Sequence, residues 1–153
     1  MKMYSSVIIP TYHRPQSLIR TLRSLQDQTL ANFETIVVDN AADPQTERMV
    51  VEFNQKARHE ARYVSHPSGG NTGARHRGAR EARGDLLVFT DDDVTFAPRW
   101  LEAHLEAYDE EPEMAAAAGP VEPMWETRPP QWLIDYLQTR TRVRNRGGLP
   151  SSL

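Results

Sequence analysis

The chain has 153 residues and 39% hydrophobic content, which is enough for one domain with a single buried core. The formal net charge of −3 gives no reason to expect general binding to nucleic acid, and the absence of cysteine excludes disulfides and thiolate metal sites. The apolar runs are far shorter than the roughly 20 residues of a membrane-spanning helix, and residues 1–12 lack the apolar core of a secretory signal. These features predict a soluble, cytoplasmic protein.

The first half of the chain alternates strand-like and helix-like segments. A β-branched run at residues 5–10 predicts the first strand, and Pro15 then suits the first turn of a helix. Residues 33–39 predict a second strand, Asp43 is placed to cap a second helix, and residues 61–66 predict a short third strand. The apolar positions that give the two helices one buried side each are Leu18, Ile19, Leu22 and Leu25, then Met49, Val50 and Phe53.

The second half continues the alternation. Asn71 or Thr72 is predicted to cap a third helix, whose buried side contains only alanine and glycine. Residues 85–90 are almost continuously apolar, which is typical of a strand covered on both faces. Pro98 opens a further helix, and residues 114–121 predict a fifth strand on weaker grounds, because alanine is a poor strand former.

A last predicted helix at residues 129–138 completes the pattern. Strands and helices that alternate five times predict an α/β fold with a mostly parallel sheet and helices on both faces. In such sheets ligands bind beyond the carboxyl ends of the strands. The segments that follow the predicted strands are "PTYHR", "DNAAD", "SGGNTGARHR" and "DDD".

Three adjacent carboxylates, Asp91, Asp92 and Asp93, follow the fourth predicted strand. They repel one another unless a cation compensates them, and Mg²⁺ and Mn²⁺ prefer oxygen ligands. We therefore expect a divalent-cation site here; a solvated acidic loop is the alternative. The D-x-D-x-T motif of haloacid-dehalogenase-like phosphatases is set aside because no lysine follows Lys56, and an EF-hand because Phe96 stands where its loop needs glycine.

Taken in order, the segments "VIIPTY", "IVVDN", "GARHRGAREARGD" and "LLVFTDDD" resemble the family 2 glycosyltransferases of the GT-A fold, over about residues 5 to 125. The resemblance implies a Rossmann-like, nucleotide-sugar-binding domain at residues 1–125, the N-terminal donor-binding portion of such an enzyme. Residues 126–153 would be the start of an acceptor region or a truncated tail. The implied ligands are a nucleotide-diphosphate sugar, UDP-linked by default, and Mn²⁺ or Mg²⁺, and the implied reaction inverts the anomeric carbon.

The resemblance also implies roles for residues at the first three strand ends. Pro10, Thr11 and Tyr12 would line the pocket for the nucleobase, with the tyrosine ring against the base. Asp39 would accept a hydrogen bond from the base, and Arg75 would contact the base or the diphosphate. Each has a structural alternative: Tyr12 covers the sheet end, Asp39 caps a turn, and Arg75 is a solvated helix charge.

The acidic triplet takes the central role in the resemblance. Asp91 and Asp93 correspond to the D-x-D motif, with Asp92 near the ribose hydroxyls and Asp93 as the best direct metal ligand. Physical chemistry agrees, because a cation held by carboxylates offsets the negative charge of a departing nucleoside diphosphate. One departure is His76, which stands where relatives carry asparagine.

The catalytic base is not assigned by the sequence. Relatives use a carboxylate beyond the fifth strand to accept the proton of the acceptor hydroxyl, and no such motif is recognised here. We therefore expect the donor-binding half of a longer enzyme or a truncated product. A non-catalytic nucleotide-sugar-binding module is the alternative; a nucleotidyltransferase is less favoured, because "PTYHRPQS" lacks the glycine- and arginine/lysine-rich loop of that class.

The acceptor is expected to be a saccharide or a lipid-linked molecule. Trp125 and Trp132 lie beside prolines, and they either stack on sugar rings or cover the sheet edge. The alternating arginines near the end of the sequence either meet anionic lipid at the inner face of the membrane or form a solvated tail. These arginines are Arg140, Arg142, Arg144 and Arg146.

Overall fold

The computed structural model describes residues 3–67, 69–125 and 127–140. Contacts divide the chain into two units, Met1–Ala117 and Ala118–Leu153. This boundary comes earlier in the sequence than the predicted one at residue 125. Among the described residues, the first unit contains a four-stranded sheet and four helices, and the second contains one helix.

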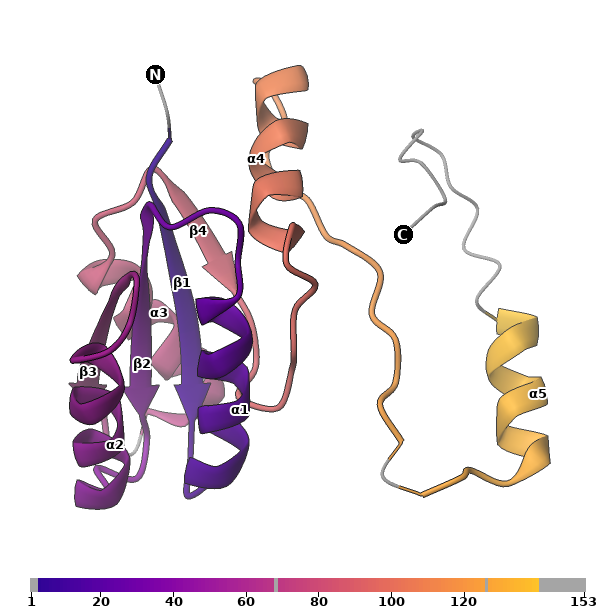
Figure 1. Ribbon diagram of the computed structural model, residues 1–153, viewed down its shortest axis with the longest axis horizontal. Coiled ribbons are helices and arrows are strands. Elements are labelled where there is room, and N and C mark those ends of the chain that lie inside the picture. Colours follow the sequence, from indigo (N-terminus) through magenta and orange to yellow (C-terminus); the bar gives the residue numbers. More distant parts are fainter. Residues whose placement is uncertain (1–2, 68, 126, 141–153) are drawn as a thin grey trace. The chain divides into compact units, whose positions relative to one another are not determined.

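The sheet is parallel throughout and its strand order is β3-β2-β1-β4. The strands are β1 (Ser5–Thr11), β2 (Phe33–Asp39), β3 (Glu60–Ser65) and β4 (Leu86–Phe89). Their arrowheads point to the same end of the sheet (Figure 1). Every residue of β1 and β2 is buried. The fourth strand, expected from its apolar run to be covered on both faces, is partly exposed at Leu87 and Phe89.

The helices begin close to the predicted positions. A proline occupies the first turn of both α1 and α2, and the Asp43 side chain caps α2 by accepting a hydrogen bond from the Gln45 amide. The helices are α1 (Pro15–Gln26), α2 (Pro44–Asn54), α3 (Gly70–Glu81), α4 (Trp100–Glu110) and α5 (Gln131–Arg140). With the parallel strands they confirm the α/β class.

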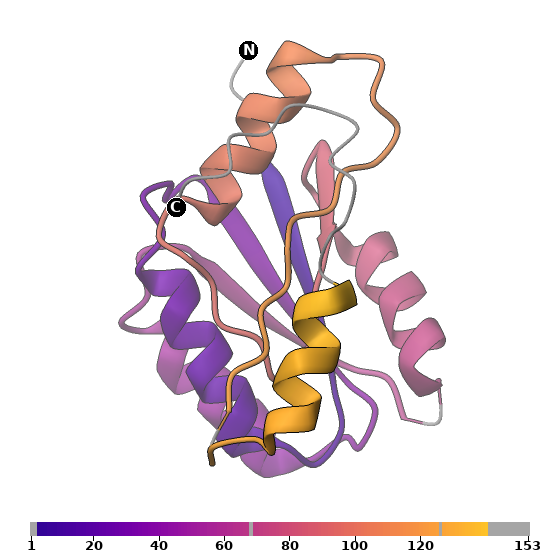
Figure 2. The same ribbon diagram turned by 90° about the vertical axis from the view of Figure 1, so that its right-hand side faces the viewer.

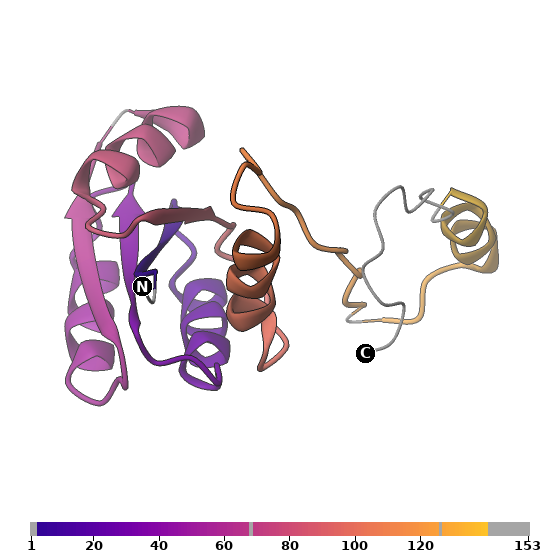
Figure 3. The same cartoon turned by 90° about the horizontal axis from the view of Figure 1, so that it is seen from above.

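Two apolar clusters lie on opposite faces of the sheet. Val7 and Ile9 of β1 point into the larger cluster, together with the buried sides of α1, α2 and α4. Ile8 points the other way, into a smaller cluster that includes Ala74 of α3. Figures 2 and 3 show α3 on the side of the sheet opposite to α1 and α2. The predicted helices on both faces are therefore confirmed.

The strand order reverses between β1 and β4. The chain moves outward from β1 through β2 to β3, and α3 then carries it back to the opposite side of β1. In the register Ile8 lies opposite Phe89, and the Thr90 amide donates to the Ile8 carbonyl at 3.1 Å. The loop after β4 thus runs beside the end of β1, at the switch point where α/β sheets bind ligands.

Two predictions about the elements are wrong. Residues 114–121 form no strand; this stretch is mostly exposed, and its alanines supply little apolar surface to pack. Neither Asn71 nor Thr72 caps α3, because both lie inside the helix, which begins at Gly70 with Gly69 at its N-cap. Gly70 has a φ of 61°, a value that favours glycine. Within the part of the chain that the structure describes, no helix combines the length and apolar character needed to cross a bilayer.

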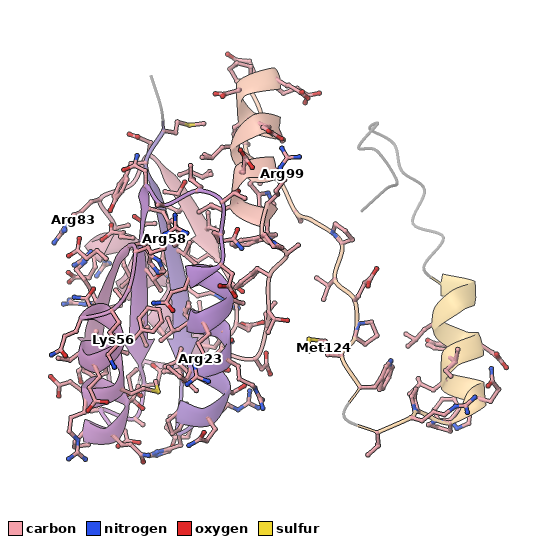
Figure 4. All side chains as sticks on the ribbon, viewed as in Figure 1. Arg23, Lys56, Arg58, Arg83, Arg99 and Met124 are labelled. Atoms are coloured by element: carbon pink, nitrogen blue, oxygen red, sulfur yellow. The ribbon has the colours of Figure 1, made fainter. Side chains whose placement is uncertain are left out.

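A buried acid fastens the opposite end of the sheet. Glu34 of β2 accepts hydrogen bonds from the Ser6 hydroxyl (2.7 Å), the Arg83 amide (2.7 Å) and the Arg62 guanidinium (2.9 Å). Burial opposes the ionisation of Glu34, but these hydrogen bonds together lower its pKa below the usual value. Figure 4 shows Arg83 near the end where the strands begin, so this network holds the fold together away from the switch point.

Candidate functional site

A cavity of about 700 Å³ opens at the carboxyl ends of the strands. Its size lies within the usual range for ligand sites, roughly 300 to 1,000 Å³. Loops after β1, β2 and β4 and the start of α3 surround it. The lining residues are Pro10, Thr11, Tyr12, Arg14, Asn40, Gly70, Asn71, Asp91, Asp92 and Asp93. Six of the eight residues predicted to form the site line this cavity.

Asp92 is the buried member of the acidic triplet. Its carboxylate accepts a hydrogen bond from the Thr11 hydroxyl at 2.6 Å and another from the Arg14 guanidinium at 3.3 Å. Its carbonyl accepts from the Thr21 hydroxyl of α1 at 2.9 Å. Asp92 therefore fastens the loop after β4 to β1 and α1, while the predicted contact with ribose stays a prediction.

Asp93 and Asp91 are the exposed members. The side chain of Asp93 is 53% exposed and its Oδ2 lies 3.0 Å from Nη1 of Arg14. The side chain of Asp91 is 55% exposed and its Oδ1 lies 2.6 Å from Nη2 of Arg75. The hydrogen bond to Asp92, followed by that to Asp93, raises the pKa of Arg14 above its ordinary value. Each exposed carboxylate thus faces a cation from another segment of the chain.

Arg75 lies on the first turns of α3 but not among the lining residues of the cavity. Its Nε is buried without a hydrogen-bond partner among the described residues, whereas Nη2 holds Asp91. Arg75 is thus paired with a carboxylate of the acidic triplet. A contact between Arg75 and a base or diphosphate stays a prediction.

Tyr12 projects from the loop after β1. Its residue surface is 60% exposed, and its ring meets the His13 ring edge to face at a centroid distance of 4.5 Å. His13 has a φ of 51°, a strained value for a residue other than glycine. The turn keeps the tyrosine ring at the wall of the cavity, where an aromatic face can stack on a planar ligand.

Asp39 lies just outside the lining of the cavity, and its predicted hydrogen bond with the base stays a prediction. It is fully buried, does not line the cavity, and accepts hydrogen bonds from the Ala41 and Asp43 amides, each at 2.8 Å. It also accepts one from the Tyr63 hydroxyl at 3.1 Å; burial, and then this contact with Asp39, raises the pKa of Tyr63 to about 12. The carboxylate therefore shapes the turn, as the structural alternative expected.

Asn40 is a cavity residue that sequence reasoning missed. Its backbone N–H donates to the Thr11 carbonyl at 3.0 Å. Its side-chain Oδ1 is buried with no hydrogen-bond partner in the described structure. A buried acceptor without a partner in a cavity wall suits a ligand N–H or O–H group. Its position directly after Asp39 at the strand end indicates a site residue. The sequence does not show, however, which of these two side chains faces the cavity.

Arg14 was missed as well, although it belongs to the "PTYHR" segment. The sequence could have indicated it, because Arg14 is a cationic residue two positions after Tyr12, in a loop expected to face three carboxylates. Gly70 and Asn71, which also line the cavity, are the first two residues of α3 and belong to the glycine-rich segment "SGGNTG".

The chemistry of the acidic triplet fits a hard divalent cation. In the described residues no three histidine, cysteine or acidic side chains are grouped closely enough to hold a metal alone. Mg²⁺ and similar ions, however, are usually held by one or two carboxylates together with substrate phosphates. Asp93 and Asp91 offer two exposed carboxylates at the cavity, and this number suits such a shared site.

The sequence pattern that defines glycosyl transferase family 2 matches residues 6–151. The chain belongs to this family. The glucosyl-dolichyl phosphate glucuronosyltransferase of Haloferax volcanii is 30% identical over 135 residues, which are 85% of this chain and 42% of that protein. The succinoglycan biosynthesis protein ExoM of Rhizobium meliloti is 31% identical over 134 residues, 86% of this chain and 43% of the relative.

The fold of this family 2 glycosyltransferase chain is also found among solved structures. Residues 1–349 of S. aureus TarS, crystallised with UDP-GlcNAc, are 30% identical to it with a TM-score of 0.61. The match covers 71% of this chain and 32% of the TarS chain. The expected GT-A fold is thereby confirmed. The chain spans less than half the length of the relatives compared here.

Proposed function

We propose that this chain binds a nucleotide-diphosphate sugar, with UDP as the default nucleotide, and serves as the donor-binding part of a metal-dependent, inverting glycosyltransferase. One observation carries the proposal: two exposed aspartates flank a buried one at the wall of a cavity of about 700 Å³, at the switch point of the sheet. TarS, which shares this fold, was crystallised with UDP-GlcNAc. The names of the two relatives support a sugar acceptor that is lipid-linked or part of a polysaccharide.

The residues of the cavity divide the work of binding. Asp93, with Asp91, would hold Mn²⁺ or Mg²⁺, and the bound ion supplies positive charge that stabilises the departing nucleoside diphosphate. Asp92 and Thr11 keep this loop in place through their 2.6 Å hydrogen bond. Tyr12 offers its exposed ring to the nucleobase, next to the Pro10 and Thr11 backbone.

Asn40 orients the same ligand from the second strand end. Its buried Oδ1 accepts a hydrogen bond from the nucleotide, which supplies the partner that this atom lacks among the described residues. Arg75 holds Asp91 in position at 2.6 Å and contributes positive charge on the side of the cavity where the diphosphate lies. The general base for the acceptor hydroxyl is not assigned to any residue.

The proposal is tested by titrating UDP in a calorimeter with and without Mn²⁺. Wild-type protein should bind UDP more tightly when Mn²⁺ is present. Asp93→Ala should lower that affinity by at least about tenfold, because even residues that only support metal ligands contribute 10- to 100-fold to metal affinity. In this variant, Mn²⁺ should no longer increase the affinity for UDP.

Asp85→Ala is the matched control. Asp85 is also exposed but precedes β4, at the other end of the strand from the acidic triplet. This variant should keep the affinity and the Mn²⁺ effect of the wild type. If Asp93→Ala leaves both unchanged, the proposed site is wrong. If UDP-sugar binds with Mn²⁺ but no sugar reaches any acceptor, the chain is a binding module without transfer activity.

A further inference from the structure

The arginines around the acidic triplet hold it in two unequal pairs. Nη1 of Arg14 contacts two carboxylates at once, Oδ2 of Asp93 at 3.0 Å and Oδ1 of Asp92 at 3.3 Å. Arg75 contacts Asp91 alone at 2.6 Å. Three negative charges thus meet two positive ones, and every carboxylate that would serve the cation already has a protein partner.

The pair between Arg14 and Asp93 is the one best suited to exchange. Both side chains are more than half exposed, 57% for Arg14 and 53% for Asp93. Solvent screens such a pair, so that its contribution to stability is small. Asp92, by contrast, is held by Thr11 and through its backbone by Thr21, so its position does not depend on Arg14.

A guanidinium and a divalent cation exclude each other at this carboxylate. Both are positive, and Nη1 of Arg14 already lies 3.0 Å from Oδ2 of Asp93, so it would repel a cation bound to the same carboxylate. The cation therefore gains Asp93 only by losing the contribution of Arg14 to that carboxylate. The measured binding free energy of the cation therefore equals its interaction with Asp93 minus the interaction of Arg14 with Asp93 that is lost.

We propose that Arg14 is an intramolecular counter-ion that competes with the divalent cation for Asp93 and weakens binding of the free cation. This inference rests on the proposed function, because it requires a cation site at Asp93. It assigns a role to a residue that has no part in the sequence motif. It also explains how the loop after β4 keeps three adjacent acids in a folded position before any ligand binds.

The test measures Mn²⁺ binding without nucleotide, by the electron paramagnetic resonance signal of the free ion. Arg14→Gln should bind Mn²⁺ roughly two- to fivefold more tightly than the wild type, the change expected when an exposed ion pair no longer competes. Arg14→Lys keeps a positive charge at the same place and should stay within about twofold of the wild type. Circular dichroism and thermal unfolding establish that each variant is folded.

Arg23→Gln is the control for a general change in charge. Arg23 is exposed on the last turn of α1 (Figure 4). Arg14 precedes the first turn of the same helix. Arg23→Gln should bind Mn²⁺ as the wild type does. A gain in Arg23→Gln equal to that in Arg14→Gln would overturn the competition, as would an unchanged or weaker affinity in Arg14→Gln.

The proposed function fails in a different way. If wild-type protein and Arg14→Gln both bind no Mn²⁺, even with UDP present, then there is no cation site at Asp93. If wild-type protein binds Mn²⁺ with UDP and Arg14→Gln gains nothing, the cation site stands and only the counter-ion role of Arg14 is wrong. A gain shared by Arg14→Lys would mean that loop shape, and not charge, limits the cation.

Discussion

Neighbouring residues in the loop after β4 take different roles because they differ in burial. Asp92 is buried and accepts hydrogen bonds from Thr11 and Arg14, while Asp91 and Asp93 are more than half exposed at the same cavity. A sequence of three identical acids thus yields one anchor and two exposed carboxylates. The anchor fixes where the other two lie, which a binding site for a small cation requires.

His59 is a residue whose environment makes a pH-dependent prediction. It is buried beside Phe33, with ring centroids 4.1 Å apart, and Phe53 packs near it. Burial lowers the pKa of His59 from 6.5 to about 4. Between pH 6.5 and about 4, His59 is therefore protonated in the unfolded chain but neutral in the folded protein. The free energy of unfolding should fall as the pH decreases through this range.

The measurement compares urea unfolding of the wild type and His59→Phe at several pH values between 4 and 7. The phenyl ring keeps the aromatic contact with Phe33 and removes the titration. The wild type should lose up to about 3 kcal/mol more than His59→Phe over this range, since one pKa unit corresponds to 1.36 kcal/mol. Parallel loss of stability in the two proteins would show that His59 is protonated equally well when folded.

Residue types at the strand ends were predictable from the sequence, but their directions were not. Asp39 is the last residue of β2 and Asn40 follows it; both are polar, and only Asn40 lines the cavity. The reason is the turn that Asp39 itself closes with the Ala41 and Asp43 amides, in which Ala42 adopts a φ of 52°. These hydrogen bonds hold the Asp39 carboxylate in its own loop, and no property of the letters "DNAAD" decides which of the two residues lines the cavity.

At the scale of the elements, close contact between α3 and the sheet depends on a glycine. A Cβ atom added at Gly78 would lie 2.4 Å from Cγ2 of Ile8 and 3.2 Å from Cγ2 of Val38, both buried core residues. Gly78→Ala should therefore destabilise the protein by about 1–3 kcal/mol through overpacking. The gain in helix propensity, about 1 kcal/mol, offsets only part of this loss.

Gly73→Ala gives the matched comparison on the same helix. Its Cβ would meet the His66 ring at 3.3 Å, and this ring is only half-buried and can move. Chemical denaturation should find the stability of Gly73→Ala within about 1 kcal/mol of the wild type. Equal stability of the two variants would contradict the view that Gly78 sets the distance between α3 and β1.

The accuracy of the element predictions followed the strength of the local signal. The first four strands were correct because β-branched and other apolar runs of strand length leave few alternatives. The prediction of a strand at "MAAAAGPV" was wrong because alanine is depleted in strands and supplies little apolar surface to pack. The start of α3 was misplaced because Gly69 and Gly70 form the entry turn through backbone geometry and use no capping side chain.

At the scale of the whole molecule, the alternation of elements predicted the fold class but not the strand order. Whether α3 leads to the far side of β1 or to the outer edge of β3 depends on packing between segments that are distant in sequence. The small residues Ala74 and Gly78 favour the position of α3 next to β1, because they let α3 lie directly against Ile8 and Val38. That crossing places the acidic triplet beside Thr11.

The first unit, Met1–Ala117, carries its own core and the whole cavity. Every described residue that is buried and hydrophobic lies between Val7 and Leu105, and all lining residues of the cavity lie between Pro10 and Asp93. A chain of residues 1–117 should therefore fold alone. Its unfolding should be cooperative, and it should bind UDP and Mn²⁺ as the full chain does.

Calorimetric unfolding of residues 1–117 and of the full chain tests this expectation. The two transition temperatures should agree within about 4 °C, the shift that 1 kcal/mol produces in a domain of this size. UDP affinity in the presence of Mn²⁺ should agree within about twofold. If the shorter chain is unfolded, residues after 117 complete the core. If it folds but no longer binds UDP, they supply part of the binding site, and the cavity of the first unit is then incomplete as a nucleotide site.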